Sequence, residues 1–411
     1  MTRWLVVGGG SAGSVVAARL SEVTTNDVLL VEAGPDHGAE RGPVGPNVDD
    51  PRLLRPGVQV VRRGGADPVA YAQGFGLGGS SLINGSVVVG DVMAERDGHA
   101  LPIEPADPIG SVGRAVLTAT TDARSVRVVG RGGRRVSAAD AYLRPALTRS
   151  NLRVQTLTTV ERLLLDGRRV VGAVAGGVEL EADQVVLCAG AIESPALLLR
   201  SGIDTPGVGS GLQDHVGVAF TFDLAVSDSA SVPISVTVER PGRQIVVIDR
   251  LPGQEAMGAV LAGWLNVSSI GRVHVDGGRT HVELGQLSSR SDLDGMVGIV
   301  RETLDVLSHR SVRDAIGDVS VDDVGTGVAA LATDRALRDW LPDHLGGYHH
   351  LAGSCRVGTV LDRTGHAIGY EGLSVCDASA LPGVPVRNPY LAVIRLAETM
   401  SRAWCAPQRA D

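Results

Sequence analysis

The sequence predicts an α/β protein in which a Rossmann-like parallel sheet is joined to a second region built on an antiparallel sheet. Near the N-terminus, an apolar run at 5–7 enters the turn Gly8-Gly9-Gly10-Ser11-Ala12-Gly13, and helical spacing continues over 14–20. A second apolar run at 28–31 then ends on Glu32. This order of strand, glycine turn, helix and strand is a βαβ unit able to hold a dinucleotide. Between residues 218 and 287, short apolar runs alternate with turn residues, a pattern typical of antiparallel strands.

The glycines of the first turn each have a physical role. Gly8 permits the tight turn, Gly10 lets backbone amides approach a pyrophosphate, and Gly13 lets the helix pack close to the strand. The helix N-terminus offers unpaired amides and a partial positive charge to phosphates. Glu32 is placed to accept hydrogen bonds from a ribose diol. The turn therefore predicts a nucleotide cofactor.

Composition and charge limit the classes of protein. A chain of 411 residues with 44% hydrophobic and 20% charged residues is expected to form more than one globular domain. The net charge of −8 argues against a nucleic-acid partner. Arg131, Arg134 and Arg135 form a short basic segment that we interpret as a solvated turn.

The cysteines and the ends of the chain point to a reducing compartment. Cys188, Cys355, Cys376 and Cys405 are far apart and have no metal-ligand spacing, so we expect neither disulfides nor a metal site. The first predicted strand begins close to Met1 and leaves no room for a signal peptide. No apolar run approaches the ~20 residues that a membrane span needs. We therefore expect a cytoplasmic protein.

The remaining elements are predicted from apolar spacing and turn residues. A second glycine cluster occupies 74–85, and 91–136 is expected to be irregular. Helices are predicted at 137–143, 194–201, 293–308, 331–340 and 390–404. Strands are predicted at 152–156, 160–165, 170–175 and 184–188, and one antiparallel sheet is expected from 219–226, 244–250, 259–264, 271–275 and 280–287.

Six segments, in order, resemble the glucose-methanol-choline (GMC) family of FAD-dependent oxidoreductases. They cover most of the chain: 8–13 with 32–34, 78–85, 189–195, 212–215, 350–356, and 375–382 with 388–389. The resemblance implies an FAD-binding domain in three parts, 1–90, 137–217 and 341–411. It also implies a shortened cover segment at 91–136 and a substrate domain at 218–340.

The resemblance implies non-covalent FAD, because Ile83 stands where some members carry a flavin-linked histidine. Asn84 offers donors and an acceptor to the ring edge. Asp377 is placed for ribityl hydroxyls, although alone it would be interpreted as a turn or helix-capping residue. The cofactor set implied is Gly8, Gly10, Ser11, Ala12, Gly13, Glu32, Ala33, Gly78, Gly79, Ser80, Asn84, Gly85, Val160, Ala189, Gly190, Asp377, Ala378 and Pro389.

The resemblance also implies that His350 is the catalytic base, since imidazole titrates near operating pH. Asn388 is the partner that holds the substrate oxygen, although alone it would be an ordinary N-cap. Pro389 precedes a helix whose positive end is expected to face the flavin. His349 is expected to point away from the site. A metal site at His349, His350 and Cys355 would lack a fourth ligand.

The sequence departs from the family in its short cover and in its aromatic content of only 3%. We therefore expect an open site suited to a bulky alcohol or to direct access by an organic or protein electron acceptor. The predicted reaction is oxidation of an alcohol to a carbonyl by hydride transfer to FAD. Two alternatives stay open at this stage: a lyase of the hydroxynitrile type with structural FAD, and a non-catalytic flavoprotein.

Overall fold

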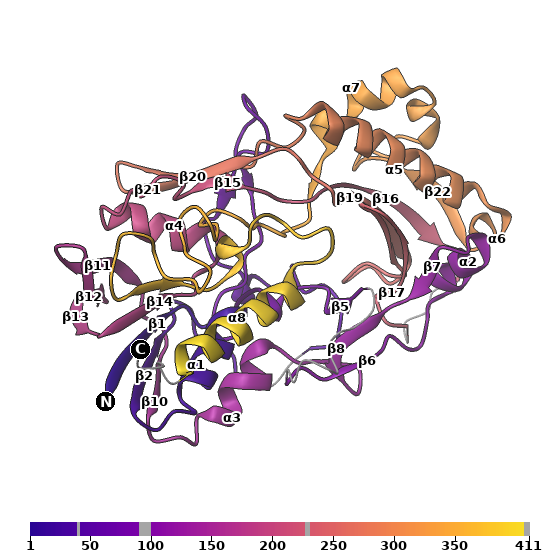
Figure 1. Cartoon of the computed structure of the whole chain (residues 1–411). Helices are drawn as coiled ribbons and strands as arrows, with labels where there is room; N and C mark the ends of the chain where they lie inside the picture. The colour runs from indigo at the N-terminus through magenta and orange to yellow at the C-terminus, as the bar shows by residue number, and fades with distance from the viewer. Residues whose placement is uncertain (39–41, 90–99, 227–230, 407–411) are drawn as a thin grey trace.

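The computed structural model describes residues 1–38, 42–89, 100–226 and 231–406, and its N-terminal strand lies at the centre of a five-stranded parallel sheet (Figure 1). The strand order is β10-β2-β1-β14-β24. Its members are β1 (Thr2–Val7), β2 (Asn26–Val31), β10 (Leu152–Gln155), β14 (Gln184–Leu187) and β24 (Leu373–Val375). The sheet is therefore assembled from segments that are far apart in the sequence.

Alternate residues of β1 face two different layers of the molecule. Trp4 and Val6 pack with α1 (Ser11–Leu20) and α8 (Tyr390–Cys405) in one core cluster. Leu5 and Val7 belong to a second cluster with α4 (Gly190–Arg200) and the antiparallel sheet of β11 (Val160–Asp166), β12 (Arg169–Ala175) and β13 (Val178–Glu181). This alternation buries both faces of the parallel sheet, as the continuous apolar runs require.

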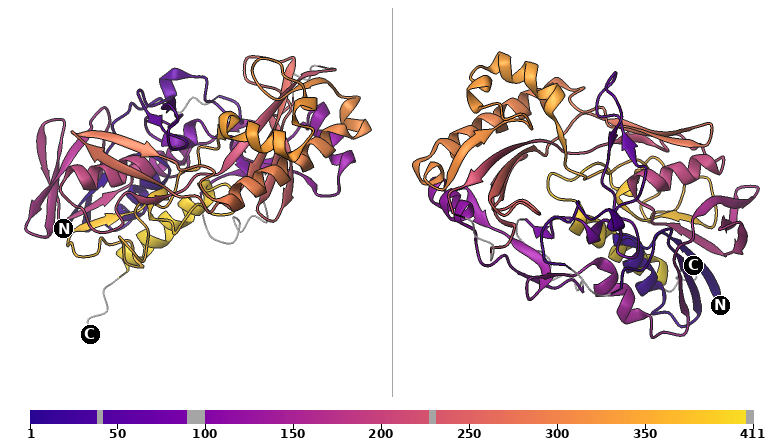
Figure 2. Two further views of the ribbon diagram at one scale, coloured as in Figure 1. Left: turned by 90° about the horizontal axis from the view of Figure 1, so that it is seen from above. Right: turned by 180° about the vertical axis from the view of Figure 1, so that it is seen from behind.

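A seven-stranded antiparallel sheet lies at the other end of the molecule, with α5 and α7 on its outer side (Figures 1 and 2). Its main path is β22-β16-β19-β18-β17-β7, and β23 pairs with β16. The strands are β7 (Ala123–Ser125), β16 (Val216–Leu224), β17 (Ile234–Arg240), β18 (Arg243–Ile248), β19 (Met257–Trp264), β22 (Ile316–Ser320) and β23 (Gly346–Gly347). The helices beside it are α2 (Ser111–Ala119), α5 (Arg290–Ser308), α6 (Arg310–Arg313) and α7 (Asp334–His344). The α/β fold class is confirmed.

The expectation of one antiparallel sheet over 218–287 is wrong in part. The last two strands, β20 (Gly271–Asp276) and β21 (Arg279–Glu283), form a separate sheet with β15 (Ser210–Leu212). Val273 and Val282 of this hairpin pack against Ala191, Ile192 and Ala196 of α4. The apolar face of this hairpin is thus buried against α4, and strand periodicity alone does not specify that partner.

Helix α4 begins at Gly190, four residues before the predicted start, although Pro195 lies inside it. Proline has no N–H to donate to the carbonyl of Ala191, one turn earlier. The hydroxyl of Ser354 donates to that carbonyl instead, at 2.7 Å. The helix ends as predicted before Gly202, which has a φ of +77°.

The segment 91–136 is not irregular where the structure describes it. It contains α2 and the strands β6 (Ile103–Pro105), β7, β8 (Arg127–Arg131) and β9 (Arg134–Arg135), of which β8 also pairs with β5 (Val87–Val88). The strands are too short for a periodic signal, which explains the error. The polar stretch 95–98 lies outside the described residues.

The remaining short elements connect these layers. The helix predicted at 137–143 is wound as a π-helix over Ala139–Leu143 and continues as α3 (Arg144–Ala146). The others are β3 (Gln59–Val60), β4 (Val69–Ala70), η1 (Pro51–Leu53), η2 (Gly79–Leu82), η5 (Val328–Leu331) and η6 (Ala378–Ala380). Within the described residues, no helix is both long and apolar enough to cross a membrane.

Candidate active site

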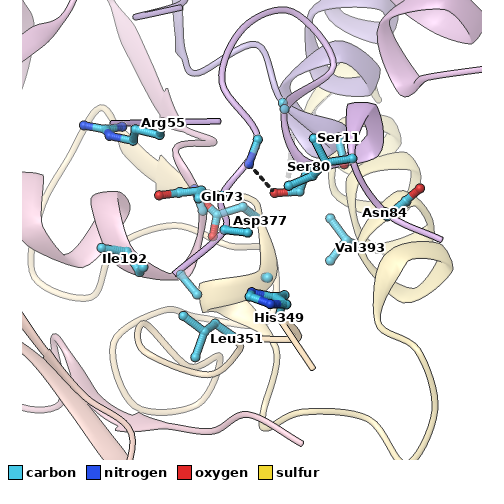
Figure 3. Close-up of a pocket in the computed structure, with 18 of the residues that line it drawn as sticks. Ser11, Arg55, Gln73, Ser80, Asn84, Ile192, His349, Leu351, Asp377 and Val393 are labelled. Atoms are coloured by element: carbon cyan, nitrogen blue, oxygen red, sulfur yellow. Dashed lines mark hydrogen bonds between the residues drawn. The ribbon is translucent and has the colours of Figure 1, made fainter. Parts of the chain in front are cut away.

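A cavity of about 570 Å³ lies between the carboxyl ends of the parallel strands and the inner face of the seven-stranded sheet (Figure 3). All but two of the site residues predicted from the sequence line it. The exceptions are Gly13 and Gly78, whose chain neighbours Ala12 and Gly79 do line it. The lining members are Gly8, Gly10, Ser11, Ala12, Glu32, Ala33, Gly79, Ser80, Asn84, Gly85, Val160, Ala189, Gly190, His350, Asp377, Ala378, Asn388 and Pro389.

The first wall of the cavity is formed by two glycine-rich loops in direct contact. A Cβ on Gly13 would lie 1.8 Å from the carbonyl oxygen of Gly8, and one on Gly79 would lie 2.7 Å from Cα of Gly10. The N–H of Gly78 donates to the carbonyl of Gly9 at 2.8 Å. A larger residue at position 79 would separate the two loops, and one at position 13 would push α1 away from its own turn. The result is a wall of exposed backbone at the N-terminus of α1, where anions are favoured.

Glu32 lies at the end of β2 with its carboxylate at the cavity. One oxygen accepts from the N–H of Gly9 at 2.6 Å and the other from the N–H of Gly34 at 2.8 Å. The side chain is 8% exposed. A carboxylate has about four acceptor sites, so two donors leave acceptor capacity for ligand hydroxyls.

Asn84 is oriented by a residue that the sequence did not identify. Its Oδ1 accepts from Nη1 of Arg135 at 2.7 Å and from the N–H of Ser86 at 3.0 Å. Because both partners are donors, the oxygen is fixed toward them, and the NH₂ group is the part available to a ligand. Only the donor half of the predicted role of Asn84 is therefore free.

Arg135 is buried, at 3% exposure, so its interpretation as part of a solvated turn is wrong. Its guanidinium donates to the backbone carbonyls of Gly45, Ser81 and Asn84. The neighbouring Arg131 and Arg134 are exposed as expected. A guanidinium has five donors, which suits it to hold several loop carbonyls at once.

Asp377 lines the cavity and also caps a helix. Its carboxylate accepts from the N–H of Gly190 at 2.8 Å, the hydroxyl of Ser194 at 2.5 Å and the N–H of Ser379 at 2.8 Å. Burial raises the pKa of this carboxyl, although those hydrogen bonds act to lower it. It thereby ties the start of α4 to η6 beneath the cavity.

A histidine cluster forms the second wall. The two segments that carry it, 213–217 and 346–352, are paired on both sides, because Gln213 bridges Ala352 and β16 pairs with β23. Between these pairings, Nδ1 of His350 lies 2.9 Å from Nδ1 of His215, and the N–H of His350 donates to Asp214 at 2.8 Å. The ring planes of His215 and His350 meet at 86°.

His349 lines the same cavity, so the expectation that it points away is wrong (Figure 3). Its φ of +59° is the left-handed region. Successive residues of an extended strand face opposite sides, and a left-handed residue breaks that alternation. His349 and His350 therefore both reach the cavity. The ring of His349 packs on the ring of Tyr71, with 4.6 Å between the ring centroids.

Burial keeps these imidazoles uncharged near neutral pH. It lowers the pKa of the fully buried His215 to about 4, and partial desolvation at the cavity, together with the charge of Arg62, lowers the pKa of His349 to about 4. Burial also lowers the pKa of His350 well below its ordinary value, and the other two histidines lower it further. The same burial raises the pKa of Asp214 to about 7, against the N–H donors of His350 and His215. Neutral imidazole is the form that accepts a proton.

Asn388 lines the cavity beside the start of α8, but it is not the N-cap, which is Pro389. Among the described residues, its buried Oδ1 has no hydrogen-bond partner. Proline at this point leaves Asn388 outside the helix, with its side chain free of a capping role. Tyr390 and Val393 of the first turns of α8 also line the cavity.

The third wall comes from the seven-stranded sheet and was not predicted residue by residue. Ile234, Val246, Ile248 and Leu261 line it with apolar surface. Gln244, on β18, is 1% exposed, and within the described chain its Oε1 has no partner. Inward-facing residues of these strands follow from the register of the sheet, which the sequence pattern does not fix.

In the part of the chain that the structure describes, the cysteines form no disulfide and belong to no metal-binding group. Cys188, Cys355, Cys376 and Cys405 are free thiols. In the described ranges, no group of three or more His, Cys, Asp or Glu residues is placed to hold a metal ion.

Comparisons with known sequences identify the family. Two models described as GMC oxidoreductase match residues 121–217 and 267–397. An uncharacterized GMC-type oxidoreductase of Rhodococcus erythropolis is 27% identical, with 97% of each chain covered. A 5-(hydroxymethyl)furfural oxidase of Methylovorus sp. is also 27% identical, over 97% of this chain and 98% of its own length. An oxygen-dependent choline dehydrogenase of Pectobacterium atrosepticum is 26% identical, over 97% of this chain and 93% of its own length.

The fold is shared with solved structures. Pyridoxine 4-oxidase from Mesorbium loti superposes with a TM-score of 0.85 at 24% identity, over 98% of this chain and 99% of its own. A formate oxidase variant from Aspergillus oryzae, described for its FAD modification, superposes with a TM-score of 0.84 at 17% identity, over 98% of each chain. The Rhodococcus alignment spans 496 positions against 411 residues here, so that relative carries segments that this chain lacks. The two matched regions cover more than half of the sequence, and the chain belongs to the GMC oxidoreductase family of FAD-dependent alcohol oxidoreductases.

Proposed function

We propose that this protein oxidises an uncharged, largely apolar alcohol, with His350 as the base and Asn388 as the partner of the substrate oxygen. The observation that carries the proposal is that His350 lines the same cavity as Asn388 and the apolar strands of the seven-stranded sheet, with its pKa lowered well below the ordinary value by burial. An alcohol that loses hydride from carbon must also lose the hydroxyl proton. A fixed neutral imidazole is suited to receive that proton.

The glycine-rich wall fits FAD. Gly10 and Gly79 present backbone without Cβ atoms, Glu32 keeps acceptor capacity for hydroxyls, and Asn84 offers its NH₂ group. When bound, FAD supplies the acceptor for the hydride that leaves the alcohol carbon. Ile83, next to Asn84, has no nucleophilic atom, which supports non-covalent binding. Acid precipitation should then release the flavin into the supernatant, whereas flavin retained in the pellet would contradict it.

Asn388 and His350 have different tasks at the alcohol. The amide of Asn388 can donate to the substrate oxygen and hold it as negative charge develops there, a term worth a few kcal/mol when the donor is preorganised. His350 takes the proton from the same oxygen. The start of α8 adds the partial positive charge of a helix N-terminus at this end of the cavity.

The substrate class follows from the third wall. Ile234, Val246, Ile248 and Leu261 offer apolar surface, and Gln244 offers an uncharged polar group. At the cavity, the cationic side chains of Arg55 and Arg200 both form ion pairs with Glu193. Burying a charged substrate group without a counter-charge is costly. These residues support an uncharged alcohol with substantial apolar surface.

The test is anaerobic bleaching of the flavin by a panel of alcohols. 5-(Hydroxymethyl)furfural and benzyl alcohol are expected to bleach it, and choline, a cation, is not. His350→Ala should slow bleaching by about 10²–10⁴-fold and Asn388→Ala by about 10–100-fold, with flavin content unchanged. His309→Ala, at an exposed histidine that caps α6, is the matched control. Bleaching by choline alone, or full activity of His350→Ala, would contradict the proposal.

The electron acceptor can be identified from the reoxidation of the reduced flavin. We propose an organic or protein acceptor, because the chain lacks segments that a longer relative carries. Bleached enzyme should regain its colour faster with a quinone dye than with air-saturated buffer. Faster recovery in air would assign the protein as an oxidase instead.

A further inference from the structure

The contact between His215 and His350 determines where the protons of both rings lie. Nε2 of His215 is 2.9 Å from the carbonyl oxygen of Pro385. A carbonyl oxygen only accepts, so Nε2 of His215 carries a hydrogen. His215 is fully buried, and burial lowers its pKa to about 4, although the backbone groups of Pro385 and Leu265 act to raise it. A neutral imidazole has one N–H, and Nδ1 of His215 is therefore an acceptor.

The proton in the contact between the rings must then belong to His350. The two Nδ1 atoms are 2.9 Å apart, a hydrogen-bond distance, and that of His215 has no hydrogen to give. Nδ1 of His350 is accordingly the donor, and Nε2 of the neutral ring has a free lone pair. The reverse assignment would place the bare Nε2 of His215 against the carbonyl of Pro385, two acceptors facing each other.

We propose that His215 is a positioning residue that selects the Nδ1–H tautomer of His350 and so leaves Nε2 free to take the alcohol proton. This inference rests on the proposed role of His350 as the base. In the step itself, the alcohol O–H bond breaks, an Nε2–H bond forms, and the electron pair stays on the substrate oxygen. The N–H of His350 toward His215 is kept throughout, so no other proton has to move.

The backbone of the two segments supports this assignment. The carboxylate of Asp214 accepts from the N–H of His350 at 2.8 Å and therefore fixes the main chain of the base. Its other oxygen lies 3.4 Å from the hydroxyl of Tyr71. Asp214 and His215 thus act on different parts of His350, one on the backbone and one on the ring. The groups that face this ring are His215, His349 and Tyr348.

The acceptor in this pair is neutral, which has a chemical consequence. A carboxylate in the place of His215 would favour the charged form of His350 and raise its pKa. A neutral imidazole orients the ring and still accepts its hydrogen bond after protonation, without a counter-charge. His350 is then kept unprotonated before the reaction, as proton acceptance requires.

The test compares two replacements of His215 in the FAD-loaded enzyme. In His215→Asn, Oδ1 takes the place of Nδ1 and can accept from His350, whereas His215→Leu has no acceptor. We expect His215→Leu to slow anaerobic flavin reduction by about 30-fold or more with little change in substrate affinity, and His215→Asn to recover most of the rate. The loss should persist at every pH, because it reflects the tautomer rather than a titration. His309→Leu is the control at an exposed histidine.

A measurement on the unmutated holoenzyme covers the case in which His215→Leu does not fold. ¹⁵N NMR of histidine-labelled protein should show His350, identified by comparison with His350→Gln, with a hydrogen on Nδ1 and none on Nε2. A signal from the Nε2–H tautomer would overturn the proposal, as would full activity of His215→Leu. If His350→Ala keeps full activity, the proposed function fails, while the NMR result still reports the tautomer.

Discussion

The two ends of the cavity are built on different principles. The wall at the N-terminus of α1 is made of backbone and glycine, and its parts come from continuous motifs such as 8–13 and 78–85. The histidine wall is made of side chains, and His215 and His350 are separated by 135 positions. The first wall has no room for an added atom at Gly13 or Gly79, whereas the second wall depends on hydrogen-bond direction. Substitutions should therefore act on space at one end and on proton position at the other.

The largest effect is expected at Gly13. In Gly13→Ala the new Cβ lies 1.8 Å from the carbonyl oxygen of Gly8, which requires α1 to move away from β1. We expect a loss of about 3 kcal/mol or more in unfolding free energy, together with loss of flavin. Urea unfolding and flavin absorbance measure both.

Gly10→Ala is the matched control for this prediction. Its Cβ would meet only Cα of Gly79, at 3.8 Å, so the fold should be nearly unchanged while the side chain takes space from the cavity. FAD affinity should fall about tenfold or more. If Gly13→Ala and Gly10→Ala destabilise the fold equally, the assignment of Gly13 to packing and of Gly10 to cofactor space is wrong.

Arg135 supports the glycine-rich wall, because it holds Asn84 and the backbone carbonyls of the loops beside it. Arg135→Met would leave the carbonyls of Ser81 and Asn84, and Oδ1 of Asn84, without this donor. We expect a loss of about 2–4 kcal/mol, measured by urea unfolding, and weaker FAD binding. The exposed neighbour supplies the comparison: Arg134→Met should change stability by less than about 0.5 kcal/mol. Similar losses in both would show that Arg135 acts only as a surface charge.

Acid should reduce the contribution of His215 to the free energy of unfolding. His215 keeps its proton off down to about pH 4 in the fold, but accepts one near pH 6.5 when unfolded. The unfolded chain then binds more protons between these values, so this group makes the unfolding free energy fall as pH is lowered from 6.5 toward 4. Asp214, with its pKa raised to about 7, contributes in the opposite direction over pH 7 to 4.

Replacing His215 with Asn should therefore remove ~2 kcal/mol of acid sensitivity over that interval. Unfolding midpoints at pH 7, 5.5 and 4.5 provide the measurement. A pH dependence identical to that of the unmutated protein would show that the His215 site is hydrated and not desolvated.

The smallest effect is expected at Gln244, in the apolar wall. Gln244→Leu removes a buried Oε1 that lacks a partner in the described part of the chain, so stability should stay equal or rise slightly. Apolar alcohols should bind a few-fold more tightly, and alcohols with a second hydroxyl a few-fold less tightly. Steady-state KM values for two alcohols that differ only in a second hydroxyl measure this change in preference. No change in their ratio would place Gln244 outside the substrate region.

The contrast between the walls also explains what could be predicted from the sequence. The turn that contains Gly8, Gly10 and Gly13, and the position of Glu32 at the end of β2, could be predicted because local backbone conformation and spacing define them. The α/β class followed from the same motif and from strand periodicity.

The missed features depend on long-range pairing. His349 faces the cavity because of a left-handed backbone angle, and His215 meets His350 because Gln213 and Ala352 pair beside them. The buried role of Arg135 depends on loops at 45 and 81–84 that lie far away in the chain. A resemblance over 212–215 marked the segment of His215 without indicating its partner.

The interleaved parallel sheet has a consequence for biosynthesis. Its order, β10-β2-β1-β14-β24, ends on a strand at residues 373–375 of a 411-residue chain. During translation, β14 therefore keeps one unpaired edge until the ribosome has passed residue 375, and α8 emerges later still. A chain that stops before this point has neither the edge strand nor Asn388. Nascent chains consequently expose a sheet edge throughout the synthesis of the long stretch between β14 and β24, a stage at which chaperone protection is most valuable.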